Sequence, residues 1–214
     1  MPLQKKDFIE IEFTGRIKDG NIFDSNIKSD IDKAHLKLEA EPFTLCLGEG
    51  MFLKGVEDFL IGKPENPSIY KIELEPKDAF GIRDTKLIQV IPINIFYQQK
   101  TNPSPGMIFN FDGRIGKILS VSGGRVITDF NHPLAGKNVL YEINILKKID
   151  DINEKTKSLI KFFTRKDFKF EIRDKKLIIE ADKQFGNFFL LFKDKFKEIL
   201  DLDLEIKEIS KASQ

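Results

Sequence analysis

The chain has 214 residues, of which 35 are basic and 34 acidic, so its net charge is +1. A balance this even argues against a nucleic-acid-binding protein, which usually carries a clear basic excess. No stretch approaches the roughly 20 consecutive apolar residues that span a membrane, and the N-terminus lacks the apolar run of a signal peptide. We therefore expect a cytoplasmic protein with no membrane partner.

The chain carries none of the short motifs that usually mark a nucleophile or a metal site. There is no P-loop, no GxGxxG fingerprint, no CxxC, no HExxH and no nucleophile elbow. Cys46 is the single cysteine, so no internal disulfide can form, and its place between two leucines predicts a small core side chain. The motifs therefore give no support to metal-dependent or nucleophilic catalysis.

The N-terminal segment predicts two strands and a helix. Alternating apolar and polar residues predict a strand at Phe8–Phe13, which we expect to end at Gly15. Asp19-Gly20 is a strong hairpin signal, because both residues tolerate positive φ. The charged segment 27–40 has apolar residues at helical spacing and predicts a short surface helix.

Residues 43–62 predict a strand, a two-glycine turn and a short helix. Gly48-Glu49-Gly50 forms the turn. Glu57 and Asp58 lie in the first turn of the helix, where exposed backbone N–H groups favour negative charge. Positions i, i+3 and i+4 of the helix are apolar and predict its buried face: Val56, Phe59 and Leu60.

Residues 83–130 have a different character and predict a small β module. The run 87–97 is strongly apolar. Three or four short strands joined by tight turns are expected, among them 107–111, 115–121 and 126–130.

Residues 150–214 predict an α-β-β-α-β region. Asp151 and Glu154 have the spacing of a capping box at the start of its first helix. The second helix is expected at 187–200, where phenylalanines form a stripe. The strands are expected at 168–172, 177–181 and 202–206. A region this small is expected to need a partner surface.

An ordered series of motifs runs through the first two thirds of the chain. Its members are Phe13-Thr14-Gly15, Phe23-Asp24-Ser25, the stretch from Leu47 to Glu57, Ala79-Phe80-Gly81, the stretch from Asn131 to Gly136, and Tyr141. The series resembles the FKBP-type peptidyl-prolyl cis/trans isomerases. The insert after Gly81 is typical of the SlyD-like branch, and the added C-terminal region is similar to the long archaeal members of that branch.

The resemblance implies an α+β fold. It implies an FKBP-like antiparallel β half-barrel around a short helix, with an inserted small β-rich flap domain and a C-terminal α-β-β-α-β domain. The isomerase domain would comprise residues 1–82 and 131–149. The insert-in-flap chaperone domain would comprise residues 83–130, and the C-terminal domain residues 150–214.

The resemblance also implies a site. Asp24, Phe80 and Tyr141 would be its catalytic residues. The substrate-binding pocket would be formed by Phe13, Phe23, Met51, Phe52, Val56 and Leu134. Phe13 and Phe80 stand where the family usually has tyrosine, and Val56 stands where human-type members have tryptophan. Taken singly, an aromatic residue is more often part of a core than of a site, and Asp24 has an equally good alternative as a turn residue.

The activity implied is peptidyl-prolyl cis/trans isomerisation with chaperone activity. The partners would be unfolded or partly folded proline-containing polypeptides. The chaperone surface would come from the apolar run, at Ile88, Val90, Ile91, Ile93, Phe96 and Tyr97. The family implies no cofactor. Relatives often have a metal-binding tail rich in histidine and cysteine, but Glu208–Gln214 has neither residue, so no metal is predicted.

Two rival functions stay open. One is a holdase that binds unfolded chains and has little isomerase activity. The other is an assembly scaffold, such as a homodimer, in which the C-terminal region drives association. The stripe formed by Phe188, Phe192 and Phe196 motivates this second alternative.

Overall fold

The computed structural model describes residues 1–65 and 68–209. The last five residues of Glu208–Gln214, the segment for which no metal binding is predicted, lie outside the described residues. The chain divides into two compact units. The first comprises Met1–Arg16, Gly20–Ile72 and Leu140–Gln214, and the second comprises Ile17–Asp19 and Glu73–Val139. In the part of the chain that is described, no helix is long and apolar enough to cross a membrane.

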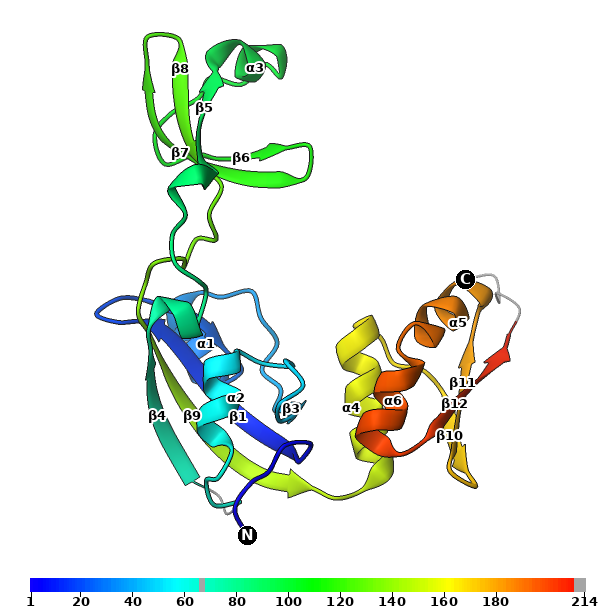
Figure 1. Cartoon of the computed structure of the whole chain (residues 1–214). Coiled ribbons are helices and arrows are strands. Elements are labelled where there is room, and N and C mark those ends of the chain that lie inside the picture. Colours follow the sequence, from blue (N-terminus) through cyan, green and yellow to red (C-terminus); the bar gives the residue numbers. More distant parts are fainter. Residues whose placement is uncertain (66–67, 210–214) are drawn as a thin grey trace. The chain divides into compact units, whose positions relative to one another are not determined.

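A five-stranded sheet organises the N-terminal part of the first unit (Figure 1). Its order is β2-β1-β9-β4, and β3 pairs with β1. The strands are β1 (Phe8–Ile17), β2 (Ile22–Ser25), β3 (Phe43–Cys46), β4 (Ser68–Leu74) and β9 (Val139–Ile149). Two short helices accompany them, α1 (Lys28–Ala34) and α2 (Lys54–Leu60). β1 pairs antiparallel with both β2 and β3.

The first strand differs from the expectation, because β1 continues through Gly15 to Ile17. A Cβ atom at Gly15 would lie 2.8 Å from the Tyr141 ring and 3.0 Å from the Phe23 ring. Glycine is therefore required here by close ring packing and does not end the strand. The register of β1 against β2 shifts immediately after Gly15.

The second unit contains a four-stranded antiparallel sheet of order β5-β8-β7-β6 (Figure 1). Its elements are β5 (Ile88–Pro92), α3 (Ile93–Gln98), β6 (Ile108–Phe111), β7 (Arg114–Ser122) and β8 (Arg125–Asp129). Two 3-10 turns precede them, η1 (Pro76–Asp78) and η2 (Thr85–Leu87). Pro92 ends the strand and serves as the N-cap of α3, so the apolar run divides into a strand and a helix.

The C-terminal region has the order α4 (Ile152–Thr164), β10 (Phe170–Arg173), β11 (Lys176–Ala181), α5 (Lys183–Leu190), α6 (Lys193–Leu200) and β12 (Asp203–Glu208). The Asp151 side chain accepts a hydrogen bond from the Glu154 N–H at 2.8 Å, so the predicted helix start is confirmed. The single helix expected at 187–200 is wrong. Phe192 has non-helical dihedrals and separates α5 from α6. β11 and β12 are parallel, and a parallel pair needs a long crossover, which the two helices provide.

The fold is therefore mixed, with helices and largely antiparallel sheets, as the α+β prediction requires in its coarse form. Closure of the first sheet into a half-barrel and the three predicted domain boundaries stay predictions.

Candidate prolyl-binding site

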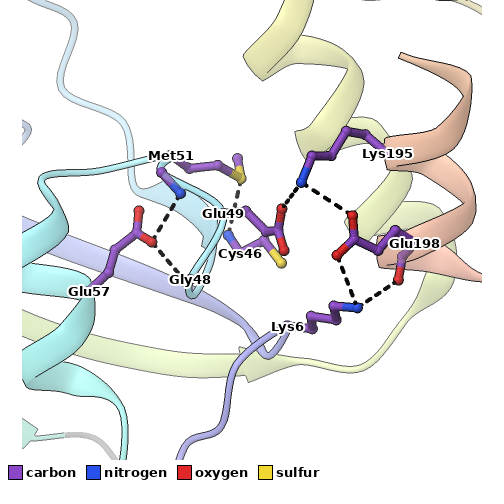
Figure 2. A network of polar contacts seen from close by, with 9 residues as sticks. Lys6, Cys46, Gly48, Glu49, Met51, Glu57, Lys195 and Glu198 are labelled. Carbon is purple, nitrogen blue, oxygen red and sulfur yellow. Dashed lines mark hydrogen bonds and ion pairs between the residues drawn. The ribbon is translucent and has the colours of Figure 1, made fainter.

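The turn between β3 and α2 is built around one buried carboxylate (Figure 2). The Glu57 side chain accepts hydrogen bonds from the backbone N–H groups of Gly48 at 2.8 Å, Gly50 at 3.2 Å and Phe52 at 2.6 Å. Both glycines have positive φ, 85° and 70°, a conformation that costs other residues free energy. The turn shape therefore depends on two glycines and on Glu57.

The sequence assigned Glu57 only to the start of a helix, where it would favour the helix dipole. Its real role is larger, because a side chain that is 2% exposed satisfies three backbone donors of the preceding turn. The sequence does contain a signal for this contact, which is a glutamate seven residues after the glycine turn. Its meaning became clear only from the three-dimensional path of the turn.

Four aromatic rings of the first unit converge. The Phe52 ring lies 4.8 Å from the Phe13 ring and 5.5 Å from the Tyr141 ring, in edge-to-face geometry both times. The Phe23 ring packs edge-to-face on Tyr141 at 5.9 Å. Such contacts stabilise an apolar cluster of defined shape, in which Phe13 and Tyr141 are buried and Phe23 and Phe52 are half-buried. The structure thus brings together four of the predicted site residues, which lie on β1, β2, β9 and the turn before α2.

Asp24 adds a carboxyl group to this cluster. Burial raises the pKa of the Asp24 carboxyl above its usual range. A hydrogen bond that the carboxyl accepts from the Ser25 backbone lowers this pKa, but by less. Burial also raises the pKa of the Tyr141 hydroxyl, and the negative charge of Asp24 raises it further. Perturbed groups beside an apolar cluster are typical of functional sites.

Asp24→Asn is expected to raise the free energy of unfolding at neutral pH, because the ionised Asp24 carboxylate is partly withdrawn from water. The raised pKa means that the wild type loses stability as pH rises from the ordinary value of 3.8 through the folded-state pKa. The gain of the variant should therefore be largest at neutral pH and vanish below pH 3.8. Urea unfolding of both proteins across this range measures it, and a difference that does not change with pH would contradict the burial of the charge.

Two other predicted pocket residues are buried, as Phe13 and Tyr141 of the cluster also are. Met51 is buried, and its Sδ accepts a hydrogen bond from the Cys46 backbone N–H at 3.1 Å. Val56 has no accessible surface, so its side chain does not reach a ligand in this conformation. The predicted contact of Val56 with substrate would require neighbouring side chains to move.

The remaining predicted pocket residues belong to the second unit. The Phe80 ring stacks on the His132 ring with 4.8 Å between centroids and 1° between planes. The Leu134 backbone N–H donates to Nδ1 of His132 at 3.2 Å. His132 therefore fixes the turn that carries Leu134 and supports the ring of Phe80.

Comparisons with known proteins bear on the family of this chain. Residues 2–99 match the family model of the FKBP-type peptidyl-prolyl cis-trans isomerases. A short-type peptidyl-prolyl cis-trans isomerase from Methanocaldococcus jannaschii is 30% identical over 146 residues, which cover 67% of this chain and 92% of that protein. This chain belongs to the FKBP-type peptidyl-prolyl cis-trans isomerase family. The enzyme class that the resemblance implied is confirmed.

The second unit of this FKBP-type isomerase also has a counterpart. Residues 89–134 match the family model described as FKBP26, IF domain. The isomerase SlyD of Vibrio cholerae is 26% identical over 151 residues, which cover 68% of each chain. A crystal structure of the three FKBP domains of wheat FKBP73 matches 70% of this chain and 41% of that one, with 14% identity and a TM-score of 0.33.

The IF domain corrects part of the predicted chaperone surface. Phe96 is wholly buried and forms the core of this domain with Ile118 and Val126, so it offers no surface. Ile91 and Ile93 pack against the same core. The correction arises because an apolar run in the sequence does not reveal which of its faces the rest of the sheet covers.

The opposite face of the same sheet is open and carries four exposed apolar side chains, with Lys117 and Ser120 of β7 between them. Val90 pairs with Ile127 across β5 and β8, and both residues share that face with Ile108 on β6 and Ile115 on β7. Their exposed fractions are 58% for Val90, 38% for Ile127, 68% for Ile108 and 64% for Ile115. Ile88 is half-buried at the end of this face, and Tyr97 is exposed on α3. The predicted chaperone surface did not include Ile108, Ile115 and Ile127. Their alternation with polar residues along the strands was the signal that could have placed them on this face.

Among the residues described, no three His, Cys, Asp or Glu side chains are grouped closely enough to hold a metal ion.

Proposed function

We propose that this FKBP-type isomerase rotates X–Pro bonds against the aromatic cluster of Phe13, Phe23, Phe52 and Tyr141. Rotation breaks amide resonance and crosses a barrier of ~18–20 kcal/mol. The twisted amide is less polar than the planar one, so an apolar surface favours it over the ground state. A rate gain of ~10³ needs only ~4 kcal/mol of such differential binding.

The supporting observation is the convergence of the rings beside the half-buried carboxyl of Asp24. No proton transfer and no covalent bond is required, which agrees with the absence of a nucleophile motif. In the proposed site Asp24 and Tyr141 contact the polar part of the prolyl peptide, and Met51 supports the wall formed by the rings. Phe80, Leu134 and Val56 keep their predicted roles as proposals.

Phe52→Ala is expected to lower kcat/KM for a short proline peptide about tenfold. Tenfold corresponds to ~1.4 kcal/mol, which is the scale of the edge-to-face contacts that the Phe52 ring makes. Exchange spectroscopy by NMR on the cis and trans peptide resonances measures the rate directly. The matched control is Phe59→Ala on α2, whose ring packs on Tyr70 away from the cluster. Equal activity of wild type and Phe52→Ala would remove the cluster from the mechanism.

The IF domain is proposed to bind unfolded, proline-containing polypeptides in the cytoplasm through the apolar face of its sheet. Four large apolar side chains on one open sheet face form the kind of patch that marks a protein-binding surface. Capture of a chain there raises the local concentration of its prolyl bonds at the isomerase site. A holdase without isomerisation is the alternative that this same face favours.

An assembly scaffold is the second alternative. The phenylalanine stripe that motivated it packs inside the C-terminal region, where Phe196 is wholly buried and the Phe192 ring stacks on Phe163. The exposed apolar side chains that could serve an assembly are instead Leu190 and Leu191, at the junction of α5 and α6. A homodimer through the C-terminal region should then give a concentration-dependent sedimentation coefficient. A coefficient that stays constant up to high concentration would exclude this assembly.

A further inference from the structure

Helix α6 of the C-terminal region reaches the turn that carries Met51 and Phe52 (Figure 2). The Lys195 ammonium group donates to the Glu49 carboxylate at 2.9 Å and lies 3.3 Å from the Glu198 carboxylate. Lys6, just before β1, lies 3.4 Å from the same Glu198 carboxylate and donates to the Glu198 backbone oxygen at 3.2 Å. One network therefore connects α6 with the turn and with the start of β1.

The Lys195–Glu49 pair differs from most other ion pairs among the described residues because its acidic side chain is largely covered. The Glu49 side chain is 10% exposed, whereas that of Lys195 is 48% exposed. A carboxylate withdrawn from water depends on its partner more than an exposed one does. Consistently, the hydrogen bond to Glu49 is the main cause that raises the pKa of Lys195.

The turn is thus held from two sides. On the inner side Glu57 binds the N–H groups of Gly48, Gly50 and Phe52. On the outer side Lys195 binds Glu49, which lies between the two glycines. The Phe52 ring that follows packs on Phe13 and Tyr141. Any loosening at Glu49 therefore changes the position of a ring in the proposed site.

We propose that Lys195 is a positioning residue of the prolyl site and acts through Glu49 on the ring of Phe52. The C-terminal region would thereby hold the turn in its binding conformation. The two family models match residues 2–99 and 89–134, so α6 lies outside both of them. The proposal rests on the proposed role of Phe52, and its test separates the two.

Cys46 provides a readout that does not depend on activity. It is the single cysteine of the chain, it has no accessible surface, and its backbone N–H is bound to Met51 of the turn. Burial, with the charges of Glu49 and Glu57, raises the pKa of Cys46 to about 12. Only the thiolate reacts, so labelling by a disulfide reagent should be slow until the turn opens.

In the full chain, Lys195→Met is expected to make Cys46 react with the reagent about fivefold faster than in wild type. Its kcat/KM on the proline peptide should fall about threefold. Changes of this size are within the range that one partly covered ion pair accounts for. Lys195→Arg should restore both values, because it keeps the charge. The matched control is Lys197→Met on the same helix, whose pairs with Asp201 and Asp203 stay within the C-terminal region. It should match wild type in both measurements.

Glu49→Gln should reproduce the loss of kcat/KM of Lys195→Met, and combining the two should add little to that loss. Its labelling rate is not a test of the contact, because the Glu49 charge itself raises the pKa of Cys46. Unchanged labelling in Lys195→Met would overturn the contact. Faster labelling with unchanged peptide kinetics would overturn the positioning role. A wild type without isomerase activity would instead refute the proposed function, and labelling would then still decide whether α6 holds the turn.

Discussion

Glu57→Ala is expected to cost about 3 kcal/mol of stability and more than 90% of the isomerase activity. The Glu57 carboxylate is the acceptor for three backbone donors, and each donor left without a partner in a covered position costs ~1–3 kcal/mol. Water can reach the exposed glycines and recover part of that cost. The turn should lose its shape, so the Phe52 ring should leave the cluster. Urea unfolding and NMR exchange on a short proline peptide measure the two losses.

The matched control for this variant is Asp58→Ala, one residue further along α2. Asp58 is exposed and pairs with Lys54 on the same helix, so its removal should change stability by less than about 1 kcal/mol. Glu57→Gln preserves the side-chain shape but presents N–H groups to some of the donors, and it should lie between alanine and wild type. Similar stability of all four proteins would contradict the role given to Glu57.

Val90→Lys combined with Ile127→Lys is expected to abolish the chaperone effect and to leave peptide catalysis unchanged. The two side chains are exposed cross-strand neighbours on the open face of the IF-domain sheet, Val90 on the edge strand β5 and Ile127 on β8. Charges there should prevent unfolded chains from binding, so the advantage of local concentration is lost. Catalysis of proline-limited protein refolding should fall about tenfold or more, since avidity effects of this kind exceed 10². The rate on a short proline peptide should stay within a factor of two of wild type.

The control adds the same charge without removing apolar surface. Ser120 and Ser122 lie on the same face of the sheet, with Ser120 directly opposite Ile127, so Ser120→Lys combined with Ser122→Lys introduces two lysines at polar positions. This variant should retain most of the refolding activity. Equal losses in both double variants would assign the effect to charge alone, and equal losses on peptide and protein would refute the division of labour.

Local patterns predicted most strands and the turn before α2, because alternation and glycine pairs depend on neighbouring residues. The extent of β1 was not predictable in this way. Gly15 is typical of a strand end in isolation, and only the approach of the Tyr141 ring, 126 residues away in the sequence, explains why glycine continues the strand.

The aromatic members of the site were predictable only through the family resemblance, since an aromatic residue in a strand is as compatible with a core. Contacts between distant residues were not predictable at all. Lys195 and Glu49 are separated by 146 positions, and neither has a distinctive neighbourhood in the sequence. Phe96 was predicted wrongly for a related reason, because α3 carries its side chain into the core formed with Ile118 and Val126, which are distant in the sequence.

The most direct test of the account is the refolding of a protein whose slow phase is limited by an X–Pro bond, with catalytic amounts of the full chain. Without a catalyst this phase takes ~10–100 s at room temperature. We predict that its rate rises in proportion to the concentration of the wild-type chain and that less of the refolding protein aggregates. A slow phase of unchanged rate, with aggregation still suppressed, would contradict an isomerase acting on protein chains and would leave a holdase.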